Sequence, residues 1–317
     1  MTNRTKHFGL AATVCALALA GCATETKPAR VARAAPSAAP RATPIDRDLA
    51  AQASAFETFM RHAQNIDAQF SGPAEVSQAL QTGAAHDPRE LESGMIAYAA
   101  LAAMQEPRFV AAVRAERDRG ELARRLTADP RTALGLPGGD QAGARASGAL
   151  YAQGAALSGE GEKVKRAAYS VQHQAWSKAP VADPAGRLSR VKRISAEGYR
   201  PSREDSAHLR AALSEGARRG GAPSPVVARG VALAALSVLG EDGKARSLMS
   251  EPKSSSCLRL AKLNLYQCLA SAGPHYEDIY CLGEHAMIEP GRCVVDATRA
   301  GPSPARRLPV SKASYRR

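Results

Sequence analysis

The chain has 317 residues, and 43 Lys and Arg against 30 Asp and Glu give it a formal net charge of +13. Such a charge is typical of nucleic-acid binders, but residues 48–298 are nearly neutral and the excess lies toward the two ends, so we expect no nucleic-acid partner. Aromatic residues are 4% of the chain and the wider hydrophobic group is 44%, so the apolar content is mainly Ala, Leu and Val, which favours closely packed helices in one large domain or two small ones.

The first segment has Arg4 and Lys6 in front of an apolar run that ends in Leu19-Ala20-Gly21-Cys22. A charged front, a short apolar middle and small residues at the end are typical of a secretory signal, and the run is too short for a permanent membrane span. The cysteine directly after Leu19-Ala20-Gly21 makes the segment resemble a bacterial lipoprotein signal. The resemblance implies that residues 1–21 are removed and that Cys22 is acylated; the alternative is an ordinary secretory signal with a chance cysteine.

Residues 22–45 are rich in Pro and Ala and nearly free of larger apolar side chains. Such a segment cannot bury enough surface to offset its ordering entropy, so we expect a lipidated tether. Ala23 and Thr24 follow the cysteine without an aspartate, and by analogy with the lipoprotein family this implies a periplasm-facing anchor in the outer membrane, with the inner membrane as the alternative.

From residue 46 the apolar spacing becomes helical, and residues 46–250 are expected to form an all-helical body. A first helix is expected over residues 46–72. A second begins after Asp87 as cap and Pro88 at the first turn, and a third runs from Pro107 to near Pro130. Their expected buried residues share a spacing of three or four positions: Leu49, Ala53, Phe56, Met60, Ala63, Ile66, Phe70; Leu91, Met95, Tyr98, Leu101; Phe109, Val110, Val113, Leu122, Leu126.

After a break at residues 134–139, the pattern predicts helices over 141–157, 162–178 and 188–194, one capped by Ser202, and one opened by Ser224 and Pro225. Residues 231–239 are apolar nearly all round, which is typical of a central core helix. No stretch alternates with period two between hairpin dipeptides. The predicted fold class is therefore all-α: a multi-helix bundle or a diverged array of helical pairs, with a C-terminal disulfide-linked helical hairpin.

That hairpin is predicted over residues 251–298 from four cysteines, Cys257, Cys268, Cys281 and Cys293. An even number of thiols in an oxidising compartment indicates two disulfides. The pairs 268/281 and 257/293 have nearly the same midpoint, at a turn marked by Gly273 and Pro274, so an antiparallel hairpin brings each pair together. A four-thiolate zinc site is the alternative, but zinc ligands usually come in pairs two to four residues apart. We expect no metal and no cofactor.

The densest set of ionisable groups follows the hairpin turn: His275, Glu277, Asp278, Cys281, Glu284, His285. On a helix most of these could share a face and serve a metal or acid–base chemistry; the alternative is a solvated face beside a disulfide.

A second candidate site consists of Tyr169, His173 and Trp176 at helical spacing within 162–178. Aromatic side chains stack on sugars and peptides, so the three could line a ligand pocket, whereas the alternative is ordinary core packing.

Two segments of the hairpin, Leu263-Asn264-Leu265-Tyr266-Gln267-Cys268 and Gly273-Pro274-His275-Tyr276-Glu277-Asp278, are similar to uncharacterised lipoproteins of Gram-negative bacteria. That resemblance implies no particular activity. Two Ser-x-x-Lys matches, at Ser189 and Ser250, lack the companion motifs of penicillin-recognising enzymes, so we assign no catalytic residues.

Residues 299–317 form a basic tail with no acidic residue. It is suited to bind anionic lipid or envelope polysaccharide, or else only keeps the protein soluble. The sequence therefore favours a lipid-anchored envelope protein with a structural or protein-interaction role, without enzymatic activity. A binding module for a small molecule or a peptidoglycan fragment is the alternative, and an envelope hydrolase has the least support.

Overall fold

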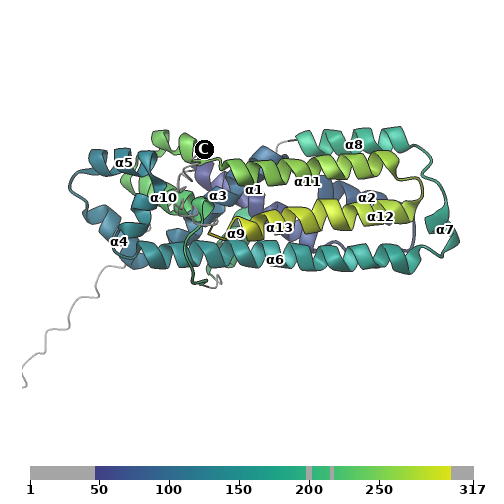
Figure 1. The fold of residues 1–317 in the computed structure, drawn as a ribbon, viewed down its shortest axis with the longest axis horizontal. Coiled ribbons are helices and arrows are strands. Elements are labelled where there is room, and N and C mark those ends of the chain that lie inside the picture. The colour runs from purple at the N-terminus through teal and green to yellow at the C-terminus, as the bar shows by residue number, and fades with distance from the viewer. Residues whose placement is uncertain (1–46, 198–201, 215–217, 301–317) are drawn as a thin grey trace, which may run out of the picture. The chain divides into compact units, whose positions relative to one another are not determined.

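The computed structural model describes residues 47–197, 202–214 and 218–300, and all the regular structure in these ranges is helical apart from one isolated β-bridge between Pro180 and Pro274 (Figure 1). The all-α prediction is confirmed. All of these residues belong to one compact unit, Thr43–Arg317. The predictions for Cys22, the tether and the tail beyond residue 300 concern residues outside the described ranges.

The N-terminal part consists of α1 (Arg47–Gln64), α2 (Pro73–Ala84) and α3 (Pro88–Ala103). Helices α1 and α3 pack together, and the rings of Phe56 and Tyr98 lie 5.3 Å apart between them. Asp87 caps α3 by accepting hydrogen bonds from the backbone of Arg89 and Glu90, as predicted. The single helix expected over 46–72 was wrong, because α1 ends at Gln64 and Pro73 opens a separate helix; Phe70 is nevertheless buried in the loop between them.

The helix expected between Pro107 and Pro130 is also divided, into α4 (Pro107–Ala115) and α5 (Arg119–Ala128). The side chain of Asp118 accepts a hydrogen bond from the backbone of Glu121, so this aspartate starts a new helix instead of continuing the old one. The predicted apolar residues of both helices are all buried. A short 3₁₀ segment, η1 (Pro130–Gly135), follows and leads into the break that the sequence indicated.

Helix α6 (Gly139–Val171) is one 33-residue helix, whereas the sequence predicted two. It passes through Gly159 and Gly161 without interruption, and two of its glycines, Gly154 and Gly161, allow close packing. A Cβ atom at Gly154 would lie 2.6 Å from the Gly291 carbonyl oxygen, and one at Gly161 would lie 2.8 Å from Met287 and Ile288. We call Gly154, Gly161, Gly283 and Gly291 the glycine seam, since they let α6 meet the C-terminal helices at backbone distance.

The next elements are α7 (Ala175–Lys178), α8 (Pro184–Ala196), α9 (Arg203–Ser214), α10 (Pro225–Leu239) and η2 (Asp242–Leu248). Ser202 and Asp205 cap α9 reciprocally, with backbone-to-side-chain hydrogen bonds of 3.0 and 3.1 Å. Helix α10 is buried on nearly all sides and packs against α3 and α6, which confirms the predicted core helix. In the described ranges, no helix combines the length and apolarity needed to cross a membrane.

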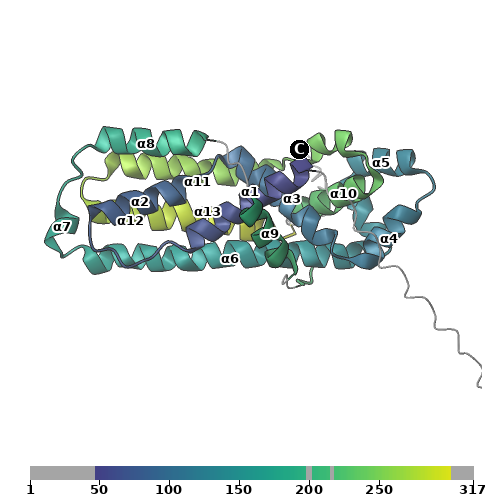
Figure 2. The ribbon, with the colours of Figure 1, turned by 180° about the vertical axis from the view of Figure 1, so that it is seen from behind.

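The C-terminal hairpin pairs α11 (Pro252–Ser271) with a continuous helical run made of α12 (His275–Cys281), the π-helical segment η3 (Leu282–Ile288) and α13 (Glu289–Asp296). Both predicted disulfides are present, with Cα–Cα distances of 5.7 Å for Cys257–Cys293 and 5.6 Å for Cys268–Cys281. In Figures 1 and 2, α6 runs beside α12 and α13, and α8 lies beside α11.

Candidate functional site

The three residues of the predicted aromatic site do not share a helix. Helix α6 ends at Val171, and the chain turns so that Trp176 falls on α7. The hydroxyl of Ser177 donates to the carbonyl oxygen of Val171 and closes this turn, which is why the helix expected over 162–178 was wrong. His173 is exposed, and Trp176 is half-buried against the core, with its indole N–H donating to Gln174.

Tyr169 does line a cavity, but with different partners. This cavity, of about 400 Å³, lies beside the Cys268–Cys281 disulfide, and three tyrosines contribute to it: Tyr169 from α6, and Tyr276 and Tyr280 from α12. We call it the tyrosine pocket. The ring of Tyr169 meets that of Tyr280 edge-on at 6.4 Å. Gln172 and Glu277 add polar groups, so the pocket combines aromatic faces with hydrogen-bonding groups.

One edge of the tyrosine pocket is fixed by an ion pair. Lys165 Nζ lies 2.6 Å from Glu284 Oε2 and 5.4 Å from the ring centre of Tyr280. The hydrogen bond to Glu284 raises the pKa of Lys165, and burial acts in the opposite direction. The ammonium group therefore stays charged beside the Tyr280 ring and holds α12 and η3 against α6.

The ionisable cluster of the hairpin is dispersed into separate contacts. Cys281 is in a disulfide, Glu284 pairs with Lys165, and Glu277 Oε2 accepts a 2.8 Å hydrogen bond from the backbone of Gly273. His285 Nδ1 lies 3.1 Å from Glu289 Oε1, and burial together with the Arg187 charge lowers the pKa of His275. Within the described part of the chain, no group of three or more His, Cys, Asp and Glu is placed to hold a metal ion.

Asp278, the remaining member of the cluster, is buried against Arg187 of α8. Burial raises the pKa of Asp278 to about 6, although the hydrogen bond and the charge of Arg187 act in the opposite direction. The guanidinium group also donates to the carbonyl oxygens of Leu269 and Ala272 at the end of α11. Asp278 thus joins α8 to the turn of the hairpin and is not available to a ligand.

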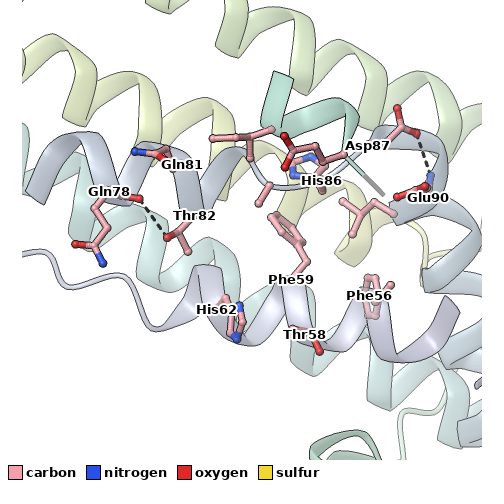
Figure 3. Close-up of a pocket in the computed structure, with 15 residues that line it drawn as sticks. Phe56, Thr58, Phe59, His62, Gln78, Gln81, Thr82, His86, Asp87 and Glu90 are labelled. Carbon is pink, nitrogen blue, oxygen red and sulfur yellow. Dashed lines mark hydrogen bonds between the residues drawn. The ribbon is translucent and has the colours of Figure 1, made fainter. Parts of the chain in front are cut away.

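A second cavity, which the sequence did not indicate, lies between α1, α2, the start of α3 and the end of α8 (Figure 3). Its volume is about 430 Å³. Phe56 and Phe59 of α1 form one wall, and the ring of His86 lies 4.3 Å from that of Phe59. We call this cavity the histidine pocket.

Behind the histidine pocket lies a buried lysine, Lys262 of α11. Its Nζ atom is 3.0 Å from the Ala84 carbonyl oxygen, 3.2 Å from Ser195 Oγ and 3.4 Å from His86 Nδ1. Burial lowers the pKa of Lys262 to about 7, and the Asp87 charge partly opposes that shift. Burial, followed by the Lys262 charge, holds the pKa of His86 well below its usual value.

One feature of the sequence indicates the buried lysine. Lys262 occupies a position of the apolar stripe of α11 that also contains Leu258, Leu265 and Leu269, all of them buried. A lysine inside such a stripe indicates either a break in the pattern or a buried ammonium group with partners. Its partners Ala84, His86 and Ser195 come from distant segments, and for that reason no spacing rule could identify them.

Comparisons with known proteins give no further guide, because no protein-family model, no curated protein and no solved structure matches this chain.

Proposed function

We propose that the protein is a lipid-anchored protein of the bacterial cell envelope with a structural or protein-interaction role and no enzymatic activity. The anchor would be Cys22, and the placement would be the periplasmic face of the outer membrane. The motif Leu19-Ala20-Gly21-Cys22 supports the anchor. The pairing of all four later cysteines in disulfides fits an exported protein, because such bonds persist in oxidising compartments.

The interaction role is supported by the buried charged residues, which join segments that are far apart in the sequence. Arg187 joins α8 to the hairpin, and Lys262 joins α11 to the end of α2 and to α8. Glu92 of α3 accepts hydrogen bonds from Ser250 Oγ and the Glu251 backbone, just before α11. Each of these groups connects segments far apart in the sequence, which supports a rigid body that presents a surface.

The anchor is tested with Cys22→Ser expressed in a Gram-negative host. The variant should leave the membrane fraction, since acyl chains would be its only strong attachment. The matched control is Cys15→Ser, which changes a cysteine of the same segment outside the motif and should stay membrane-bound. Retention of Cys22→Ser in carbonate-washed membranes would reject the anchor. Cross-linking in intact envelopes, followed by pull-down of the wild type, then tests for a protein partner.

Binding of a small molecule or a peptidoglycan fragment is the second candidate, and the tyrosine pocket favours it. Tyrosine faces beside Gln172 and Glu277 suit a sugar, which offers both C–H faces and hydroxyl groups. With an N-acetylglucosamine disaccharide as probe, Tyr169→Ala should weaken binding about threefold to tenfold in a ligand-observed NMR titration. Tyr151→Ala, which removes an exposed tyrosine of α6 away from the pocket, should not. Equal affinities of the two variants would remove this candidate.

A further inference from the structure

We propose that the outer side of α8 and α11 rests on a membrane surface that carries anionic phospholipids. The residues concerned are two exposed leucines and four exposed cations: Leu260, Leu263, Lys192, Arg193, Lys253 and Arg259. We call these six residues the leucine face. The inference deepens the proposed envelope role, because it needs a membrane beside the protein, but it uses neither the lipid anchor nor the basic tail.

The two leucines are the apolar part of this face. Leu260 is 58% exposed and Leu263 is 54% exposed, and no other leucine in the described ranges is exposed to this extent. They lie three residues apart, so they are neighbours on the side of α11 that is opposite to the buried Leu258 and Leu265. Moving both side chains into an apolar environment is favourable in proportion to the area that leaves water.

The two helices that form the face have an excess of positive charge. Neither α8 nor α11 contains an Asp or Glu. The neighbouring carboxylates lie at the helix ends or on another helix. Asp183 and Glu251 are N-caps, Glu197 follows α8, and Glu289 of α13 accepts hydrogen bonds of 3.0 and 3.1 Å from the other flank of α11. Arg190 lies 3.7 Å from Asp183 and is left out of the leucine face for this reason.

The four cations of the leucine face have no carboxylate within ion-pair distance among the described residues. Arg259 donates to oxygen atoms of the preceding turn of its own helix. Arg259, Leu263 and Tyr266 are spaced four and three residues apart and therefore form one line along α11. Lys192 Nζ lies 5.6 Å from the ring centre of Tyr266, which shows that this line borders α8. Figures 1 and 2 both show α8 and α11 side by side along one edge of the helical body.

An anionic membrane matches both features of the leucine face. Its phosphate groups attract Lys and Arg, and its apolar interior lies directly behind them and accepts leucine side chains. A polysaccharide offers the anions without the apolar layer. Residues 22–45 span at most about 80 Å when fully extended, so the proposed anchor does not determine which side of the body meets the membrane. The leucine face would determine it.

The first test measures how much of the full chain floats with vesicles, using Cys22→Ser as the parent so that no acyl chain takes part. The vesicles are phosphatidylcholine alone, or an equal mixture with phosphatidylglycerol. Leu260→Ser/Leu263→Ser should weaken binding to the mixed vesicles about fivefold to tenfold. Lys192→Gln/Arg259→Gln should weaken it about tenfold or more, since each cation near an anionic surface contributes roughly fivefold. On phosphatidylcholine alone, this cation variant should bind like the parent.

Matched controls change the same kinds of residue on other helices. Arg124→Gln/Lys163→Gln removes two exposed cations of α5 and α6, and Tyr151→Ser removes an exposed apolar side chain of α6. Both should bind like the parent. Equal binding of the leucine-face variants and these controls would overturn the proposal. A loss in the cation variant without a loss in the leucine variant would indicate a hydrophilic polyanion as the partner and would also overturn it.

A second measurement reads the orientation of the full chain with Cys22 intact, after reconstitution into the mixed vesicles. Leu263→Trp places an indole ring on the leucine face, and Tyr151→Trp places one elsewhere. Lipids with brominated tails should quench the first indole more strongly than the second, once the signal of Trp176 is subtracted. Equal quenching would contradict the leucine face. Release of Cys22→Ser from membranes in cells is measured separately, so failure of the face and failure of the anchor are distinguishable.

Discussion

Lys262 combines burial with an ammonium group, and this makes stability depend on pH. The pKa of Lys262 is about 7 in the folded state against 10.5 when exposed, so between these values the unfolded chain binds the proton more tightly. Stability therefore rises with pH in this window, by up to about 1.4 kcal/mol per pH unit from this residue. Below pH 7 both states hold the proton and the contribution no longer changes.

We expect Lys262→Met to remove this dependence. Urea unfolding at pH 7, 8 and 9 should show a rising free energy of unfolding for the wild type and a flatter series for the variant. Lys163→Met provides the control, because Lys163 is an exposed lysine of α6 that pairs with Glu160 of the same helix. Parallel pH series for the wild type and Lys262→Met would contradict the effect.

Arg187 and Asp278 form the most deeply buried ion pair described in the chain, with side chains 6% and 3% exposed. Arg187→Met should reduce the free energy of unfolding by about 3–5 kcal/mol, because it leaves a carboxyl group and two carbonyl oxygens buried without a donor. The pKa of Asp278 should rise further in this variant, so the loss should be larger at pH 8 than at pH 5.

The double variant Arg187→Met/Asp278→Leu tests whether the cost comes from the stranded charge. Replacing both partners by apolar groups should recover much of the lost stability, as for other buried pairs. A double variant as unstable as Arg187→Met alone would instead mean that the backbone contacts of Arg187 at the end of α11 account for the loss.

At the scale of the elements, replacing a glycine of α6 by alanine should have opposite effects on stability inside and outside the glycine seam. Gly161 is buried against Met287 and Ile288, whereas a Cβ atom at Gly159 would meet nothing within 4 Å. Gly159→Ala should stabilise the protein by about 0.5–1 kcal/mol, since alanine favours a helix interior. Gly161→Ala should destabilise by about 1–3 kcal/mol, because the new methyl group overpacks the contact. Thermal unfolding of the two variants measures both, and equal shifts would mean that α6 separates from η3 easily.

The sequence predicted those elements that depend on local rules. Three predictions of this kind were correct. The periodicity and the Asp87 cap located α3, the apolar run located the core helix α10, and the common turn of the cysteine pairs gave both disulfides. Errors arose where a distant segment decides the outcome. In the middle of α6, Gly161 packs against Met287 and Ile288 of η3. Beyond the end of α6, Ser177 donates a hydrogen bond to Val171 and closes the turn.

The C-terminal helical run shows the same limit. A proline usually ends a helix, but here the helical backbone continues past Pro290 to Asp296. A proline inside an α-helix clashes with the carbonyl four residues earlier, which here belongs to Ala286. The wider π-helical turns of η3 lie at this position and make room for the ring. Of the residues that line the two pockets, the sequence identified only Tyr169 of the tyrosine pocket as a pocket residue. The histidine pocket could not be predicted, because its residues come from four helices that are far apart in the sequence.

For the whole molecule, the two disulfides close loops of different size. The cysteines are 36 residues apart in Cys257–Cys293 and 13 apart in Cys268–Cys281. Restriction of the unfolded chain gives contributions of about 4 and about 3 kcal/mol respectively. Cys257→Ala/Cys293→Ala should therefore lower the unfolding midpoint more than Cys268→Ala/Cys281→Ala, as measured by guanidinium titration. Non-reducing peptide mapping of the wild type should recover the two native pairs, and a Cys257–Cys268 peptide would contradict the hairpin.

The position of the cysteines along the hairpin also bears on how the protein matures. Cys257 and Cys268 lie on one helix, eleven residues apart, so once α11 has formed they are separated by about 16 Å along its axis. That separation exceeds the reach of a disulfide, about 7 Å between Cα atoms, and the crossed pairs of the antiparallel hairpin are just as far apart. Once the helices have formed, they therefore keep the wrong cysteine pairs too far apart to bond. We expect oxidation of the protein to need an oxidase but no disulfide isomerase.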